Sequence, residues 1–387
     1  METRSISTNA ALIAIIVIIV VSAATSSIIL FGPQPNSSSI PTMSNTSLSS
    51  SLTTASSSSV SGTTNQSSSS STNLYPVNVM IGAPVPLAYY GFLWYGVSTG
   101  IFAKYGLNVN VLVGTGGPGN VAAVSSGKVD FSITDPGSIV LGWANSNITD
   151  VRLVSAVFNN EFYGVMYNKA IINKPSDLVG KTCATFQGNS GNNYFKLFAK
   201  EEGFNASGVN LLYASGAVFN NLILIGKASC LITTENQVAD LAPSAEANNI
   251  SLGFWNYADF GQVNYGNGII TSAQMIQNHP DIVKNFVIAT WQSLLASSQN
   301  PQAAVQAAIN VSPAINATTG VSELEFMLDT FIPNLNSTSN LLTLGWINQT
   351  KIQSTIETVT AGFGLTNVPS AADIFTNQFV LAPNNAS

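Results

Sequence analysis

Ionisable side chains are scarce in this chain of 387 residues. Asp, Glu, Lys and Arg make up only 8% of it, against about 25% in a typical soluble domain. None of these four residue types occurs between Arg4 and Lys104. The net charge is -6, and no basic cluster accompanies it. Nucleic-acid binding therefore lacks its usual electrostatic signature.

Histidine and cysteine are also nearly absent. The single histidine, His279, stands just before a proline at an expected helix start, which argues against a histidine-based metal centre or catalytic triad. We expect no metal, no cofactor and no catalytic residue in this chain. The first cysteine is Cys183, so a bacterial lipoprotein anchor at an N-terminal cysteine is excluded.

The segment Gly91–Trp143 alternates between helix, strand and small-residue turn. Within it, Leu107–Val113 and Val129–Ile133 alternate in the manner of strands in a sheet. Each strand runs into small residues that open a helix, at 114–118 and at 134–138. In an open α/β sheet, ligands bind at the carboxyl ends of strands, where helix N-termini offer free backbone N–H groups.

Four short segments follow one another along the chain: Gly100–Val109 (GIFAKYGLNV), Ser125–Phe131 (SSGKVDF), Asp177–Lys181 (DLVGK) and Pro280–Ala289 (PDIVKNFVIA). In this order they resemble motifs of the solute-binding proteins of ABC importers. More narrowly, they resemble the group that binds nitrate, sulfonates, taurine or pyrimidine precursors of thiamine. The resemblance implies that the chain is not an enzyme. It would capture a small molecule outside the cytoplasm and work with an ABC permease in the membrane.

The resemblance also implies a fold. This is the α/β fold of type II periplasmic binding proteins, in which two doubly wound lobes are joined by two crossovers. The first lobe would hold residues 76–163 and 256–380, and the second would hold residues 164–255. The expected strands are 77–81, 107–113, 129–133, 151–157 and 265–271 in the first lobe, and 164–168, 180–186, 209–213 and 230–234 in the second.

The N-terminal residues indicate export. After a short leader, residues 1–9, residues 10–31 are apolar or small throughout, and a run of this length can span a bilayer. We expect a transmembrane anchor or a cleaved signal segment. The leader also resembles the pilin-like leader of some archaeal binding proteins, which is cut before an apolar anchor. Each alternative places the rest of the chain outside the cytoplasm.

Residues 32–75 are rich in Ser and Thr and cannot bury enough apolar area to fold. We expect a flexible linker, and an O-glycosylated stalk is compatible with it. The motif for N-glycosylation favours an exported glycoprotein. It begins at Asn36, Asn45, Asn65, Asn147, Asn205, Asn249, Asn310, Asn316, Asn336, Asn348 and Asn385.

Cys183 and Cys230 lie on two expected strands of the second lobe. These strands are neighbours if the lobe has the doubly wound order 2-1-3. In an oxidising compartment the two side chains could pair, and we predict a disulfide between them. Two buried free thiols are the alternative.

In the resembled proteins the ligand lies between the lobes, and loops at strand ends contact it. Carried over by position, this implies a ligand site in both lobes and in the crossovers. The residues are Tyr89, Tyr90, Thr115, Gly116, Gly117, Asp135, Ser138, Glu161, Tyr163, Gln187, Asn189, Ser190, Glu235, Asn236 and Tyr265. We expect Glu235 and one of the two adjacent tyrosines, Tyr89 or Tyr90, to contact the ligand from opposite lobes.

The ligand is less sharply defined. No Arg falls in these loops, although helix N-termini and Asn, Ser and Thr donors could still hold a sulfonate or nitrate. Aromatic walls with carboxylates suit a flat heterocycle that carries amino groups. The residues therefore slightly favour a pyrimidine precursor of thiamine over a sulfonate, nitrate or taurine.

Two other functions remain open. The same fold includes pyrimidine synthases of thiamine biosynthesis, but their clustered C-C-C-F-C motif is absent from this sequence. A structural, pilus-like surface glycoprotein would fit the leader, the stalk and the low charge, although not the order of the two-lobe motifs.

The scarcity of charge also bears on pH. The chain has few carboxylates, so acid can break few ion pairs by protonating them. It also has few cations that would repel one another at low pH. We expect stability to change little from near neutral pH to about pH 2–3. Heavy glycan cover is the competing explanation for the low charge.

Overall fold

The computed structural model describes residues 73–214, 217–262 and 264–383. They belong to the second of two units of the chain, which starts at Ser69. The expected leader, the apolar segment and nearly all of the Ser/Thr-rich linker lie outside the described residues. Among the helices that are described, none has both the length and the apolar character needed to cross a membrane.

The first sheet has the strand order β2-β1-β3-β10-β4. Its strands are β1 (Tyr75–Met80), β2 (Leu107–Leu112), β3 (Phe131–Thr134), β4 (Val151–Ala156) and β10 (Gly268–Ser272). Strands β2, β1 and β3 are parallel, as the doubly wound pattern predicts, and β10 returns antiparallel between β3 and β4. Strand β10 begins three residues later than expected, so Tyr265 lies in the loop that precedes it.

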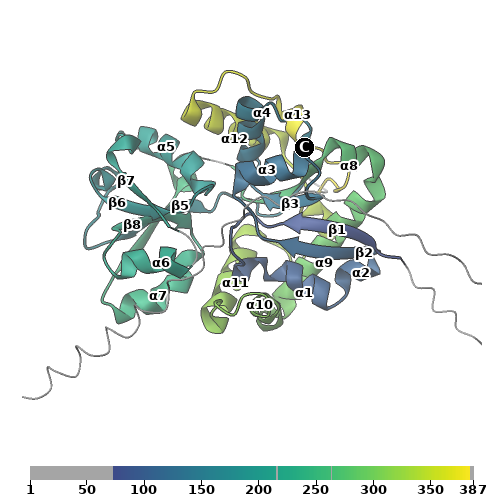
Figure 1. Cartoon of the computed structure of the whole chain (residues 1–387), viewed down its shortest axis with the longest axis horizontal. Helices are drawn as coiled ribbons and strands as arrows, with labels where there is room; N and C mark the ends of the chain where they lie inside the picture. Colours follow the sequence, from purple (N-terminus) through teal and green to yellow (C-terminus); the bar gives the residue numbers. More distant parts are fainter. Residues whose placement is uncertain (1–72, 215–216, 263, 384–387) are drawn as a thin grey trace, which may run out of the picture. The chain divides into compact units, whose positions relative to one another are not determined.

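Strand β3 is buried at every position, although its sequence alternates. Figure 1 shows the reason, because helices lie on both sides of this sheet. Helices α3 (Gly117–Ser125) and α4 (Gly137–Ser146) lie on one side, and α1 (Gly91–Ser98) and α9 (Pro280–Gln299) lie on the other. A central strand between two helical layers has no face for solvent.

The second sheet has the order β7-β6-β8-β5-β9. Its strands are β5 (Tyr163–Asn168), β6 (Thr182–Thr185), β7 (Asn210–Tyr213), β8 (Cys230–Thr234) and β9 (Leu252–Asn256). The order β7-β6-β8 repeats the 2-1-3 pattern of the first sheet, with all three strands parallel. We call each sheet, with the helices packed on it, a lobe.

The predicted disulfide is confirmed. Cys183 of β6 and Cys230 of β8 are register partners on adjacent strands, their Cα atoms are 4.5 Å apart, and a disulfide joins them. Both residues are fully buried. The alternative of two buried free thiols is therefore wrong.

Helices α5 (Gly191–Glu201), α6 (Ala217–Leu224) and α7 (Gln237–Ala247) belong to the second lobe (Figure 1). The sequence analysis missed α7 and strand β9. The remaining longer helices are α10 (Pro301–Ile309), α11 (Ala317–Phe331) and α12 (Gln349–Phe363). Helix α12 packs against α5, and α11 packs against α7, so helices from the C-terminal part of the chain contact the second lobe at two places.

Candidate functional site

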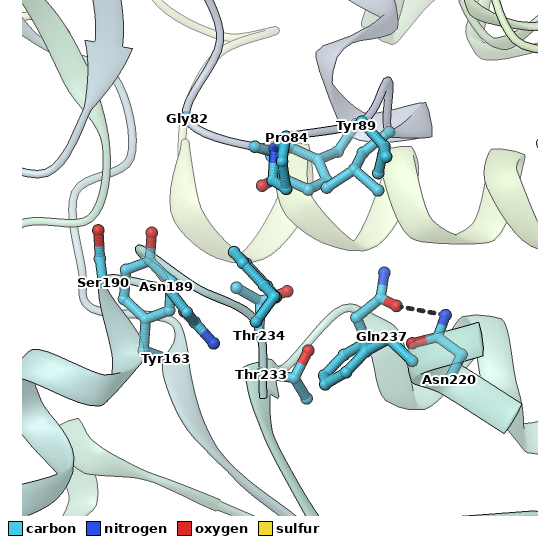
Figure 2. Close-up of a pocket in the computed structure, with 15 residues that line it drawn as sticks. Gly82, Pro84, Tyr89, Tyr163, Asn189, Ser190, Asn220, Thr233, Thr234 and Gln237 are labelled. Atoms are coloured by element: carbon cyan, nitrogen blue, oxygen red, sulfur yellow. Dashed lines mark hydrogen bonds between the residues drawn. The ribbon is translucent and has the colours of Figure 1, made fainter. Parts of the chain in front are cut away.

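A pocket lies between the two lobes, where the loop after β1 faces the carboxyl ends of β6 and β8 (Figure 2). Its volume is about 80 Å³. The first lobe contributes Gly82, Ala83, Pro84, Val85, Leu87 and Tyr89. The other lining residues are Tyr163, Phe186, Asn189, Ser190, Phe219, Asn220, Thr233, Thr234 and Gln237. We call this the interlobe pocket.

Tyr90 fixes the first-lobe wall of the pocket from behind. Its hydroxyl accepts hydrogen bonds from the backbone N–H of Gly82 (3.1 Å) and from Nδ2 of Asn267 (2.8 Å). Burial raises the pKa of Tyr90 to about 12, so the phenol stays neutral. Tyr90 is fully buried and does not line the pocket. Its neighbour Tyr89 supplies the ring that does, and burial raises the pKa of Tyr89 well above its usual value.

Asn189 fixes the second-lobe wall. Its Nδ2 donates to the backbone carbonyl of Ile232 at 2.8 Å, and its Oδ1 accepts from the N–H of Gly191 at 2.9 Å. These bonds tie the N-terminus of α5 to strand β8. Because β8 is held in this way, Thr233 and Thr234 at its carboxyl end face the pocket (Figure 2).

The pocket is aromatic and uncharged. Rings of Tyr89, Tyr163, Phe186 and Phe219 line it, and none of its lining residues is Asp, Glu, Lys, Arg or His. Burial raises the pKa of Tyr163 well above its usual value, so this phenol is neutral as well. A buried, neutral, aromatic pocket with hydroxyl and amide groups suits a small flat molecule that forms a few hydrogen bonds.

Asp135 joins the lobes beside the pocket. Its carboxylate accepts from the N–H and the hydroxyl of Ser138 in its own lobe, at 2.9 and 2.7 Å. From the second lobe it accepts from the hydroxyl of Ser190 at 2.6 Å and from the hydroxyl of Tyr194 at 2.9 Å. Four donors satisfy a fully buried carboxylate without a cation.

Gly116 lets the two backbones approach one another. Its φ is +90°, and a Cβ there would lie 2.2 Å from the carbonyl oxygen of Gly188 in the second lobe. The adjacent Gly117 is equally confined, since a Cβ there would meet the hydroxyl of Ser138. Both residues, with Thr115, form the turn that opens α3, and none of the three lines the pocket. The glycines are needed for lobe-to-lobe contact.

Among the carboxylates predicted for the site, neither glutamate lines the pocket. Glu161 is fully buried, and its Oε1 accepts from the N–H groups of Phe162 and Tyr163, both at 2.9 Å. Burial raises the pKa of Glu161 to about 8. Glu235 accepts instead from Nδ2 of Asn256 at 2.8 Å. We expected Glu235 and a tyrosine to contact the ligand from opposite lobes. Of these residues, Tyr89 lines the pocket and Glu235 does not.

The other predicted residues lie elsewhere. Gln187 is exposed. Asn236 is buried and donates to Glu323 at 2.6 Å. The hydroxyl of Tyr265 accepts from the N–H of Asn348 at 2.8 Å, and its ring lies under the ammonium of Lys351. Of the predicted set, Tyr89, Tyr163, Asn189 and Ser190 line the pocket.

Sequence reasoning missed the pocket residues that come from helices. Phe219 and Asn220 belong to α6 and Gln237 begins α7. Thr233 and Thr234 could have been predicted from the rule that ligands bind at the carboxyl ends of strands. They are the last two residues of β8, just before the predicted Glu235 and Asn236.

The comparisons with known proteins agree with this architecture. The family model described as NMT1/THI5 like matches residues 88–304, which is more than half of the chain. The chain belongs to the NMT1/THI5-like family. No curated protein sequence matches this family member.

Solved structures share the fold. The alkanesulfonate-binding protein SsuA from Xanthomonas axonopodis pv. citri, bound to MOPS, has 13% identity and a TM-score of 0.58, over 78% of this chain and 98% of that one. The aliphatic sulphonate binding protein SsuA from Escherichia coli has 10% identity and a TM-score of 0.59, over 81% and 94%. The nitrate-binding protein NrtA from Synechocystis PCC 6803 has 10% identity and a TM-score of 0.54, over 79% and 87%.

Proposed function

We propose that the chain is the extracytoplasmic solute-binding component of an ABC importer, and that it holds its solute in the interlobe pocket. The observation that carries this proposal is a pocket built jointly by two α/β lobes in a member of this family. Proteins named for sulfonate and nitrate binding share the fold, and two of them are named as periplasmic. An ABC permease is the membrane partner, and the N-terminal residues 10–31 would keep the chain near it.

The chemistry of the interlobe pocket supports a flat aromatic solute over an anion such as a sulfonate or nitrate. A sulfonate or nitrate loses hydration on entering a buried site and needs charged or multiple N–H partners there. The lining offers no cation. Rings of Tyr89, Tyr163, Phe186 and Phe219 instead present apolar faces, and Thr233 and Thr234 offer hydroxyls. A heterocycle of the kind found in pyrimidine precursors of thiamine meets these requirements, whereas sulfonate, nitrate and taurine meet them less well.

A thermal-shift screen of residues 73–387 against pyrimidines, flavins, sulfonates, taurine and nitrate tests the proposal. A true ligand at 100 times its dissociation constant stabilises the folded state by about 2.7 kcal/mol. Small-angle scattering on each hit should show a more compact particle with ligand. A screen without a single stabilising compound, and without compaction, would contradict solute binding.

A further inference from the structure

A second, wider hollow adjoins the interlobe pocket. Its volume is about 420 Å³, and it lies where α6 and α7 face α11 and the loop before α1. It shares Val85, Leu87, Asn220 and Gln237 with the interlobe pocket, so the two spaces are neighbours. Figure 2 shows Asn220 and Gln237 linked by a hydrogen bond at this boundary.

The hollow carries two carboxylates and no cation. Glu323 of α11 and Asp240 of α7 line it, and none of its lining residues is Lys, Arg or His. The partners of Glu323 are neutral: its Oε1 accepts from Asn236 at 2.6 Å and from Gln237 at 3.2 Å. Asp240 likewise accepts from the hydroxyl of Thr319 at 2.6 Å.

The hollow also has acceptors without donors. Glu323 is only 4% exposed, and its Oε2 has no hydrogen-bond partner among the residues that the structure describes. Oδ1 of Asn220, at the boundary with the interlobe pocket, is buried and likewise without a partner. Oε2 of Glu323 is not among the fully buried unpartnered atoms, so it borders accessible space of the hollow, from which a donor on a ligand can reach it.

Burial disfavours the anionic form of Glu323. Burial raises its pKa to about 8, and the neighbouring charge of Asp240 adds to this rise. A bound cation would reverse both effects, since an opposite charge within a few ångströms favours the ionised carboxylate.

We propose that this hollow receives a positively charged amino group of the bound solute, with Glu323 as its direct partner and Asp240 as the second negative charge. The proposal rests on the proposed function, because the flat part of the same solute would occupy the interlobe pocket. Gln237 couples the two spaces, since it lines both and donates to Glu323. The solute class is therefore a small aromatic or heteroaromatic amine, cationic at neutral pH.

Three probes of similar size separate the alternatives: benzylamine, benzyl alcohol and benzenesulfonate. They share a ring and differ in carrying a positive, a neutral or a negative group. Calorimetric titration at pH 6.5 should give benzylamine an affinity at least tenfold above that of either other probe. Equal or tighter binding of the alcohol or the sulfonate, or no binding of any of the three, overturns the inference. Solute binding itself fails only if the broader screen finds no ligand.

The matched variants are Glu323→Gln and Glu325→Gln. Both residues lie on α11, but Glu325 is exposed. Glu323→Gln should weaken benzylamine binding at least tenfold and leave benzyl alcohol unchanged, whereas Glu325→Gln should change neither. Circular dichroism and melting of the free variants confirm folding.

Proton release on binding distinguishes a direct contact between Glu323 and the solute from a purely structural role of Glu323, which would release no proton. Because the empty site holds Glu323 protonated near neutral pH, binding of an ammonium should release about one proton at pH 6.5. Titrations in buffers of different ionisation enthalpy measure this proton. Its absence in the wild-type chain, or its persistence in Glu323→Gln, contradicts the assignment of Glu323.

Discussion

At the scale of residues, Asp135 links the two lobes through its side chain. Two of its four donors, the hydroxyls of Ser190 and Tyr194, come from the second lobe. Its position after β3 was enough to place it near the lobe boundary from the sequence. Its role was not predictable, because Tyr194 and Ser190 approach it only after both lobes have formed. The same holds for Glu323, whose partners Asn236 and Gln237 lie more than eighty positions away.

The carboxylate of Asp135 allows a matched comparison. Tyr194→Phe removes a donor from across the lobe boundary, and Ser138→Ala removes one from within the same lobe. A hydrogen bond to a charged group contributes about 1.5–3 kcal/mol. We expect Tyr194→Phe to weaken affinity for a screened ligand roughly tenfold, because it destabilises the closed lobes.

Ser138→Ala should lower the melting temperature but leave that affinity within about twofold, because its bond exists whether or not the lobes meet. Isothermal titration of both variants measures the difference. Equal losses of affinity in the two variants would show that Asp135 stabilises the first lobe alone.

At the scale of elements, most strands could be located from the sequence, and the 2-1-3 order of three strands in each sheet was expected only from the fold that the resemblance implied. Periodicity and small-residue turns located the strands of both 2-1-3 units. Helix α7 was not predicted, because Pro243 lies inside it and proline ordinarily ends a helix. Strand β9 was not predicted, because its sequence, Leu252–Asn256 (LGFWN), is short and contains a glycine, which is unfavourable inside a strand.

Helix capping explains part of the sequon pattern. Asn316 and Asn348 are the N-caps of α11 and α12, and each side chain accepts from two backbone N–H groups of its helix. Asn205 caps a short turn, where its Oδ1 accepts from the backbone N–H and the hydroxyl of Ser207. Since Asn is a preferred N-cap residue, these three motifs have a structural reason independent of glycosylation. Glycosylation stays a prediction.

The disulfide between β6 and β8 allows a test of how much a covalent link between two strands stabilises the second lobe. Its cysteines are 47 positions apart, and closing a loop of that size stabilises a fold by roughly 4 kcal/mol on the chain-entropy model. We expect Cys183→Ala/Cys230→Ala to lower the free energy of unfolding by about this amount in denaturant titrations. Wild-type chain unfolded in reductant is the control and should match the variant. A loss below about 1 kcal/mol in both would mean that β6 and β8 hold their register without the bond.

For the whole folded unit, the structure modifies the expected response to pH. Burial raises the pKa of both Glu161 and Glu323 to about 8, from 4.5. Between these values the folded state keeps two protons that the unfolded chain releases. Stability therefore falls as pH rises through this window and is highest below about 4.5. The sequence suggested a nearly flat response, because composition does not reveal which carboxylates are buried.

The melting temperature of residues 73–387 should accordingly be higher at pH 5 than at pH 8. The variant Glu161→Gln/Glu323→Gln should show a smaller difference, because it has lost both titrating groups. Hydrogen bonds lower the pKa of the partly buried Asp177 and Asp373. Their contribution to stability is lost in stronger acid, as pH falls through the folded-state pKa values, which is a change in the opposite direction. A melting temperature that rises from pH 5 to pH 8 would contradict the account.

The central claim is that one small molecule binds in the interlobe pocket, and two positions on α6 test it most directly. Phe219 and Leu222 are both buried in the same hydrophobic cluster of the second lobe, but only Phe219 lines the pocket. Calorimetric titration of Phe219→Ala and Leu222→Ala with a ligand from the screen separates packing from binding. The account predicts at least a tenfold loss of affinity in Phe219→Ala, about 1.4 kcal/mol, and little change in Leu222→Ala. Unchanged affinity in Phe219→Ala, or an equal loss in both, would place the solute elsewhere.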